Sequence, residues 1–250
     1  TRDHFDESLN APLAPAASAQ PEVKRCGMIT LCGRPNVGKS TLTNALVGEK
    51  VAIVTNKPQT TRNRICGVRT RGESQFVFVD TPGLHKARTR LGDYMVNVVK
   101  ESVADVDAVM LLVEPIPNVG APEEQLIARI KTLRCPAVLV INKVDTLDKK
   151  EKLLEVIQTY EQAHQFQAVV PISAKTGEGV DELLDVLEGY LPQGPQLFPE
   201  DMTSDQPERQ MMAEILREKL LLCLDKEIPH GTAVEITKFS EREDEVIEVD

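Results

Sequence analysis

The sequence predicts an α/β protein with a doubly wound, mostly parallel sheet, followed by a shorter α+β segment. Between residues 25 and 190, apolar runs of strand length alternate with segments of helical spacing. Two of these runs, 108–113 and 137–141, are apolar throughout, which is typical of strands buried on both faces of a parallel sheet. Ligands of such sheets bind at the carboxyl ends of the strands, so we expect functional residues there.

Each further element is expected from its own pattern. A strand at 26–32 leads through a glycine-containing loop into a helix at 40–47, and the polar stretch 48–62 fits neither period. Strands at 64–69 and 75–79, joined by a turn that contains a glycine, predict a hairpin. Farther along the chain we expect helices at 122–133, 147–164 and 180–190 and a strand at 167–172. Pro122 suits the first turn of its helix.

The two ends of the chain differ from the central domain, residues 25–190. Residues 1–24 are small and proline-rich and are expected to form a disordered tail. Residues 191–207 contain four prolines without any period and are expected to form a linker. The remaining residues, 208–250, show helical spacing at 208–225, strand-like alternation at 232–239 and the start of another strand near 245. We expect a second, incomplete domain there.

The composition limits the class of protein. Hydrophobic residues make up 41% of the chain and aromatic residues 4%, with no Trp, which predicts a sizeable aliphatic core. The net charge is −10, yet residues 25–190 carry 21 basic and 20 acidic groups, so the acidity lies in the ends. Five cysteines without a C-x-x-C pair indicate buried free thiols in a reducing compartment. No apolar run reaches the ~18 residues of a membrane span and no secretory segment is present, so we expect a cytoplasmic protein.

A phosphate-binding loop is the strongest motif in the sequence. It matches G-x-x-x-x-G-K-[ST] and consists of Gly33, Arg34, Pro35, Asn36, Val37, Gly38, Lys39 and Ser40, with Thr41 next. The glycines let successive backbone N–H groups point at an anion. Lys39 would reach the β- and γ-phosphates, and the Ser40 hydroxyl would bind Mg²⁺. The predicted strand before the loop and helix after it supply the context that this motif requires.

Two further stretches predict the rest of a Mg²⁺ and γ-phosphate site. Asp80, Thr81, Pro82 and Gly83 follow directly on the strand 75–79. The Asp80 carboxylate could hold Mg²⁺ through a water, and the Gly83 N–H could contact the γ-phosphate. Thr60 and Thr61 lie in the irregular stretch 48–62, and a hydroxyl there would complete the Mg²⁺ coordination. Of the two we favour Thr61.

Motifs after the last two strands predict guanine as the base. Asn142, Lys143, Val144 and Asp145 follow the strand 137–141. A carboxylate at Asp145 accepts hydrogen bonds from guanine N1 and N2, a donor pair that adenine lacks, while the Lys143 stem can cover the base and Asn142 can brace the neighbouring loop. Ser173, Ala174 and Lys175 follow the strand 167–172, and the Ala174 N–H would face guanine O6.

Together these motifs resemble those of the Era GTPases, in the TrmE-Era-EngA group, from about residue 26 to the end of the chain. The resemblance implies a P-loop NTPase fold for a GTPase domain at 25–190 and slow hydrolysis of GTP with Mg²⁺. It also implies assistance in assembly of the small (30S) ribosomal subunit, through a KH domain that binds the 3′ end of the small-subunit rRNA. The helix at 208–226, with Ile228, Pro229 and His230 after it, resembles the opening of that KH domain. The resemblance alone suggests peripheral contact with the inner membrane.

The expected catalytic residues follow partly from the motifs and partly from the resemblance. Ras-like GTPases orient the attacking water with a glutamine directly after D-x-x-G. Here that residue is Leu84, which forms no hydrogen bond through its side chain. In relatives of Era, an asparagine at the place of Asn36 ligates K⁺, so K⁺ dependence is a hypothesis for this chain. The catalytic set is then Lys39, Asn36, Thr61 and Gly83.

The second domain lacks the feature by which KH domains hold RNA. That feature is a G-x-x-G loop, and Gly231 is the only glycine after residue 207. Residues 208–250 also carry 12 acidic and 6 basic groups, a poor balance for binding phosphates. We therefore expect a chain truncated within its KH domain that does not bind RNA as the family does.

Three other functions remain open from the sequence. The chain could be another Era-related ribosome-assembly GTPase, or a non-catalytic GTP-gated RNA-binding scaffold. A phosphotransferase that uses ATP is the third alternative, and Asp145 argues against it.

Overall fold

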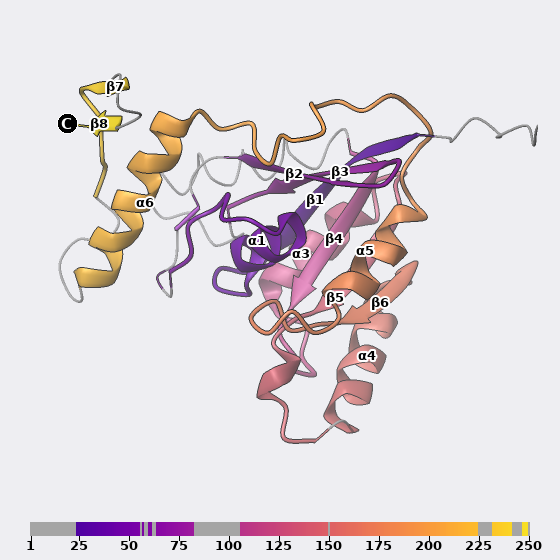
Figure 1. Ribbon diagram of the computed structural model, residues 1–250. Helices are drawn as coiled ribbons and strands as arrows, with labels where there is room; N and C mark the ends of the chain where they lie inside the picture. The colour runs from indigo at the N-terminus through magenta and orange to yellow at the C-terminus, as the bar shows by residue number, and fades with distance from the viewer. Residues whose placement is uncertain are drawn as a thin grey trace, which may run out of the picture.

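A computed structural model describes residues 24–55, 57, 60–61, 64–82, 106–149, 151–224, 232–241 and 247–249 (Figure 1). The predicted disordered tail therefore lies outside the described residues, apart from Lys24. The strands are β1 (Arg25–Gly33), β2 (Ile65–Arg71), β3 (Ser74–Asp80), β4 (Ala108–Val113), β5 (Ala137–Ile141), β6 (Ala168–Pro171), β7 (Phe239–Glu241) and β8 (Ile247–Val249). The helices are α1 (Lys39–Val47), α3 (Ala121–Ile130), the short 3-10 turn η1 (Val144–Thr146), α4 (Glu151–Ala163), α5 (Val180–Glu188) and α6 (Glu208–Cys223).

A six-stranded sheet forms the centre of the larger part, in the order β2-β3-β1-β4-β5-β6. Only β2 is antiparallel to its neighbour, β3, and the two form the predicted hairpin. All other neighbours are parallel, so that Ile29 of β1 lies opposite both Phe78 of β3 and Ala108 of β4. This confirms the doubly wound, mostly parallel α/β fold. It also brings the carboxyl ends of β1, β3, β4, β5 and β6 to one edge.

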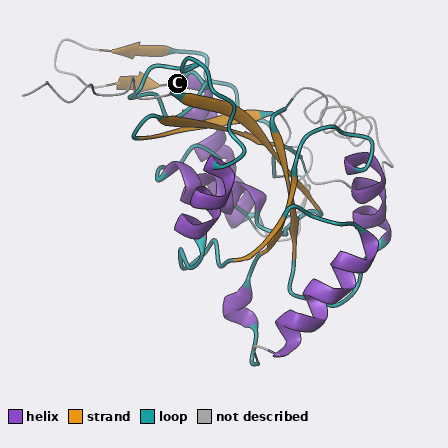
Figure 2. Cartoon of the chain, turned by 90° about the vertical axis from the view of Figure 1, so that its right-hand side faces the viewer, coloured by secondary structure: helices purple, strands orange, loops and turns teal. Residues whose placement is uncertain are grey.

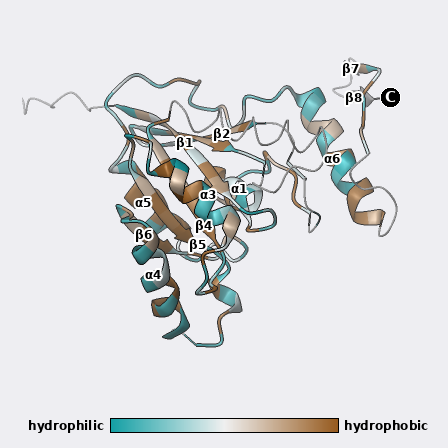
Figure 3. Ribbon diagram, turned by 180° about the vertical axis from the view of Figure 1, so that it is seen from behind, coloured by the Kyte–Doolittle hydropathy of each residue, from teal (hydrophilic) through white to brown (hydrophobic). Residues whose placement is uncertain are grey.

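Helices cover both faces of the sheet, as Figure 2 shows for the curved sheet seen from its side. On one face α1 and α5 bury Leu42, Leu46, Leu183 and Leu187 against alternate residues of the strands. On the other face α3 and α4 bury Leu126, Ile130, Val156 and Tyr160. Figure 3 shows the apolar strands enclosed between helices whose outer faces are more polar. β4 and β5 are buried throughout, which explains their continuous apolar runs.

Residues 191–207 form neither helix nor strand, yet they are packed along the sheet rather than free of it (Figure 1). Gln75 of β3 has no exposed surface, and its side-chain oxygen accepts hydrogen bonds from the N–H groups of Leu197 and Phe198, each at 2.9 Å. Farther on, the Val68 N–H donates to the Thr203 carbonyl at 2.8 Å. The proline content indicated a linker but gave no sign of these contacts. The bond from Val68 satisfies an N–H group of β2, which lies at the edge of the sheet.

The most distinct error of the sequence prediction is the strand at 232–239. Residues 232–238 form no strand, and β7 begins only at Phe239. The alternating pattern correctly indicates that Ile236 is buried, with 3% of its surface exposed. That burial comes from packing beside α6, where the Arg209 guanidinium donates to the Ile236 carbonyl, and it needs no strand partner. The division into domains at 190 and 208 remains a prediction.

Helix ends were predicted less well than helix positions. The helix expected at 122–133 is α3, Ala121–Ile130, because the chain tightens into a turn in which the Thr132 N–H donates to the Arg129 carbonyl. Pro122 lies in its first turn, as expected. The helix expected at 147–164 is α4, Glu151–Ala163. It begins later than expected, after the exposed Asp148, because that residue has no apolar side chain to pack against the sheet. The helix expected at 208–225 ends at Cys223.

The cysteines and the membrane prediction can also be compared with the structure. Cys26, Cys32 and Cys66 are buried free thiols, Cys135 is half-buried, and Cys223 is exposed, so the expectation of buried thiols was wrong for Cys223. Burial raises the pKa of Cys32 to about 12, which keeps this thiol protonated and unreactive. Among the described residues, none of the helices is both long and apolar enough to span a membrane.

The contacts of Gln75 yield a test of how firmly residues 191–207 are fixed. Replacing Gln75 by Ala should lower the free energy of unfolding by about 2 to 4 kcal/mol, because the N–H groups of Leu197 and Phe198 lose an acceptor that is itself fully buried. Urea unfolding measures this change, and limited proteolysis should cut 191–207 faster in the variant. Gln125, exposed on α3, offers a matched control, and Gln125→Ala should stay within about 0.5 kcal/mol of the unmodified chain. An equally small effect at Gln75 would contradict the expectation.

Candidate functional site

The predicted phosphate loop connects β1 to α1 at the carboxyl edge of the sheet. Gly33 ends β1 and Lys39 begins α1, and the backbone turns sharply between them, with a φ of 103° at Gly38. A Cβ on Gly33 would lie 2.6 Å from the Leu112 carbonyl oxygen, and one on Gly38 would lie 2.3 Å from the Asn142 side-chain nitrogen. Close neighbours therefore require glycine at both positions, and at Gly38 the left-handed backbone requires it as well.

The Lys39 side chain is folded back over this loop and is 6% exposed. Its ammonium group donates to the carbonyl oxygens of Arg34 at 2.9 Å and Gly33 at 3.3 Å. Burial lowers the pKa of Lys39 to about 8, and the charge of Asp80 offsets part of that shift. Because carbonyl oxygens carry only partial charge, an anion bound in the loop would stabilise the charged form of Lys39.

Three oxygen-bearing side chains meet beside Lys39. The Ser40 hydroxyl donates to an Asp80 carboxylate oxygen at 2.7 Å and lies 2.8 Å from the Thr61 hydroxyl. Since Ser40 has one proton and gives it to Asp80, Thr61 donates to Ser40. The Thr60 hydroxyl instead donates to the Lys57 carbonyl at 2.7 Å. The structure thus places Thr61, rather than Thr60, next to Ser40.

The Asp80 carboxylate has the features of a cation ligand. It is fully buried, and its second oxygen, Oδ1, has no hydrogen-bond partner among the described residues. Burial raises the pKa of Asp80, while the Ser40 hydrogen bond and the Lys39 charge oppose the rise. A buried carboxylate oxygen without a partner is costly. Two hydroxyls and a carboxylate are a ligand set that suits Mg²⁺, so the residues present fit this ion.

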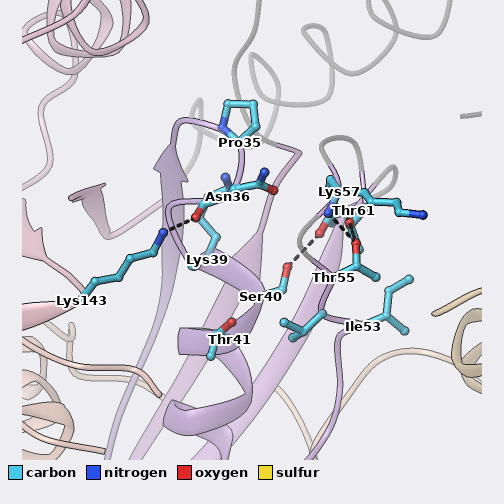
Figure 4. A pocket seen from close by; sticks show the side chains of 13 residues that line it. Pro35, Asn36, Lys39, Ser40, Thr41, Ile53, Thr55, Lys57, Thr61 and Lys143 are labelled. Atoms are coloured by element: carbon cyan, nitrogen blue, oxygen red, sulfur yellow. Dashed lines mark hydrogen bonds between the residues drawn. The ribbon is translucent and has the colours of Figure 1, made fainter. Parts of the chain in front are cut away.

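A cavity of about 360 Å³ opens in front of these residues (Figure 4). The phosphate loop and the first residues of α1, through Thr41, form one wall, and residues 53–55 with Lys57, Thr60 and Thr61 form the other. Lys143 closes one end, with its ammonium directed at the Asn36 carbonyl (Figure 4). Ser40 and Thr61, predicted from motifs 21 positions apart, therefore face the same space.

The other predicted base-binding residues follow β5, as Lys143 does, or β6. Asn142 is buried and joins two loops: its amide nitrogen donates to the Val37 carbonyl and its oxygen accepts from the Ala174 N–H, both at 2.9 Å. Asp145 is exposed, with one carboxylate oxygen held by the Ser173 hydroxyl at 2.7 Å. The Ser173 hydroxyl thus fixes the orientation of the Asp145 carboxylate, and the rest of that carboxylate is exposed.

One predicted contact differs from its expected form, and one motif residue lies away from the cavity. The Ala174 N–H, expected to face guanine O6, is bonded to Asn142 here, so its role in base binding remains a prediction. The Thr81 hydroxyl donates to the Leu31 carbonyl at 2.7 Å and is buried in the sheet, away from the cavity. Pro82 is buried beside it, and Lys175 is exposed. Gly83 and Leu84 lie outside the described residues.

Sequence reasoning missed the contact between α6 and the segment that carries Thr61. Arg217, only 2% exposed, donates to the Thr60 carbonyl at 2.6 Å. Its neighbour Glu218 accepts from the Val54 N–H at 2.9 Å and pairs with Lys50. No signal in the sequence indicated this contact, because both charged residues fall between the apolar positions of α6, where an amphipathic helix normally faces solvent.

It also missed a charged network around the phosphate loop. Glu114 follows β4 at the same edge of the sheet as Asp80 and Asn142, and its carboxylate pairs with both Arg34 and Lys143. Arg34 pairs in addition with the buried Glu123 of α3. The position of Glu114 directly after a buried strand was a usable signal, because ligands of parallel sheets bind at that edge.

Comparisons with known proteins agree with this site. Residues 28–143 match the family model described as a 50S ribosome-binding GTPase. The GTPase Era of Ruminiclostridium cellulolyticum is 49% identical over 225 residues, covering 90% of this chain and 75% of that protein. The GTPase Era of Geobacter metallireducens is 49% identical over 220 residues, covering 88% of this chain and 74% of that protein.

Two solved structures are similar over nearly the same extent. A variant of Era from Aquifex aeolicus, bound to GDP and AlF4⁻, superimposes with a TM-score of 0.83 at 37% identity, covering 88% of this chain and 75% of that one. Era in complex with MgGDPNP and nucleotides 1506–1542 of 16S ribosomal RNA gives 0.84 at 36% identity, covering 89% and 75%. On the strength of both the motifs and these similarities, the chain belongs to the Era family of GTPases.

Proposed function

We propose that this chain is a GTP-hydrolysing switch that assists small-subunit ribosome assembly. The observation that carries the proposal is the cluster of Ser40, Thr61 and Asp80 beside the buried Lys39, in one cavity with the phosphate loop. A triphosphate in that cavity would meet the loop N–H groups and the Lys39 ammonium. Asp145, at the other end of the site, would select guanine.

The residues have separate tasks in hydrolysis. Lys39 would hold the β- and γ-phosphate oxygens. Ser40 and Thr61, with Asp80 through a water, would hold Mg²⁺, which when bound would supply charge that balances the phosphates. Water attacks the γ-phosphorus, the bond to the bridging oxygen breaks, and GDP and phosphate result. We assign the Gly83 N–H to the γ-phosphate. With Leu84 in place of a glutamine, slow turnover is expected.

We further propose K⁺ as a second cation at Asn36. Its backbone is in the left-handed region, with a φ of 61°, and it lines the cavity beside Lys39. The assignment comes from the family resemblance, and the position of Asn36 in the cavity supports it. A cation there would lie where GTPases of other kinds receive an arginine finger.

The proposed partner is the 3′ end of the small-subunit rRNA, by analogy with the Era complex that contains 16S rRNA nucleotides. The second domain, 208–250, would make this contact. We place the action of this protein in the cytoplasm; contact with the inner membrane stays a prediction from resemblance alone.

Hydrolysis is tested first at Lys39. Lys39→Ala should reduce single-turnover phosphate release from GTP by at least about a hundredfold, since the charge beside the phosphates is lost. Lys131, exposed after α3 and remote from the cavity, is the matched control, and Lys131→Ala should release phosphate at the unmodified rate. Undiminished release by Lys39→Ala, or none from the unmodified chain, would favour the non-catalytic scaffold.

Base selection is tested at Asp145. Asp145→Asn should weaken GTP binding about a hundredfold and improve binding of xanthosine triphosphate, because an amide donates where the carboxylate accepted. Asp148→Asn, at an exposed carboxylate three residues on, should change neither affinity. Competition titrations measure both, and ATP displacing GTP at similar concentration would instead support an ATP-dependent phosphotransferase.

The cation hypothesis is tested by changing salt and side chain together. The unmodified chain should hydrolyse GTP faster in K⁺ than in Na⁺ at equal ionic strength. Asn36→Gly should abolish the difference, because glycine readily keeps the left-handed backbone and lacks the side-chain amide. Equal rates in the two salts for the unmodified chain would rule out the role of K⁺.

A further inference from the structure

Glu114 stands between two cationic side chains that come from different loops of the site. Arg34 belongs to the phosphate loop, and its guanidinium lies 2.6 Å from one carboxylate oxygen of Glu114. Lys143 belongs to the loop after β5, and its ammonium pairs with the other oxygen. A single carboxylate therefore connects the phosphate-binding and base-binding loops through charge.

Lys143 depends on such contacts because little packing surrounds its side chain. It lines the cavity in front of the phosphate loop and also a second hollow of about 610 Å³, which is bordered by Glu114 and residues 115–117. With open space on both flanks, its direction is set by polar partners. These are the Glu114 carboxylate and the Asn36 carbonyl, the latter at 2.8 Å. The left-handed backbone at Lys143, with a φ of 65°, starts the side chain on this path.

Arg34 has a second anchor that Lys143 lacks. Its Nε lies 2.8 Å from a carboxylate oxygen of Glu123, a residue of α3 that is 1% exposed. If the charge of Glu114 were removed, Arg34 would keep an anionic partner, whereas Lys143 would keep only a carbonyl. The effect of losing Glu114 should therefore appear mainly at Lys143.

We propose that Glu114 is a positioning residue for guanine-nucleotide binding: it holds the Lys143 side chain over the phosphate loop, where its stem can lie along the base. The proposal rests on the guanine-nucleotide site proposed above and adds a residue to it. Glu114 itself touches no nucleotide and acts through Lys143. Loss of its charge should weaken binding of GDP and GTP alike and leave the hydrolytic step of bound GTP unchanged.

The test compares affinity, hydrolysis and stability in the full chain. Glu114→Gln preserves the shape of the side chain and removes its charge. It should weaken GDP binding, followed with a fluorescent ribose-labelled GDP, by about tenfold through faster release, as expected when one partner of a charge pair is lost. Single-turnover hydrolysis of bound GTP should stay within about twofold. Glu161→Gln, at an exposed carboxylate of α4, is the control and should change neither quantity.

A double-mutant cycle decides whether Glu114 acts through Lys143. Lys143→Met keeps the stem and removes the ammonium, so adding Glu114→Gln to it should change GDP affinity by less than about twofold. A tenfold loss in both backgrounds, or none in the unmodified background, overturns the proposal. So does a loss of affinity matched by a fall in urea stability of the nucleotide-free chain, which would mean a structural role. Failure of the unmodified chain to bind GDP would overturn the proposed function itself, and this proposal with it.

Discussion

The paired hydrogen bonds of Asn142 are the interaction on which the site depends most. This one buried amide donates to Val37 of the phosphate loop and accepts from Ala174 of the loop after β6. It also leaves no room for a side chain at Gly38. Three loops that are far apart in the sequence are therefore fixed relative to one another by a single side chain. None of them can shift without exposing a buried polar group of another.

Buried charge explains why this framework favours an anion together with a cation. Lys39 is bonded to carbonyl oxygens, and Asp80 is bonded to a hydroxyl and has one oxygen without a partner among the described residues. Burial disfavours the charged form of each, and their attraction for one another restores only part of the loss. A phosphate beside Lys39 and a divalent cation beside Asp80 would supply the missing countercharges.

The sequence predicted the sheet well because each of its strands is marked by a local pattern. The runs at 108–113 and 137–141 agree with β4 and β5 to the residue. The motif residues at the strand ends were equally local signals. The predictions that failed concern residues whose contacts are with partners far away in the sequence. In the segment expected to be a strand, 232–239, Ile236 is buried, yet no strand pairs with residues 232–238 in the described part of the chain. The contacts of 191–207 include those with Gln75, more than a hundred residues away. Glu114 was missed because its charge has meaning only beside Arg34 and Lys143.

The contact of α6 shows how such long-range pairing joins the two parts of the chain. The described residues between 50 and 61 contact the site on one side, through Thr61 and Ser40, and Arg217 and Glu218 on the other. Because the carbonyl that Arg217 binds belongs to Thr60, the residue next to Thr61, the two attachments share one short piece of backbone. A movement of that backbone away from Ser40 must also change the geometry at Arg217. Ordering of Thr61 beside Ser40 and the contact of Arg217 with Thr60 are therefore linked: forming either one of them stabilises the other by the same free energy.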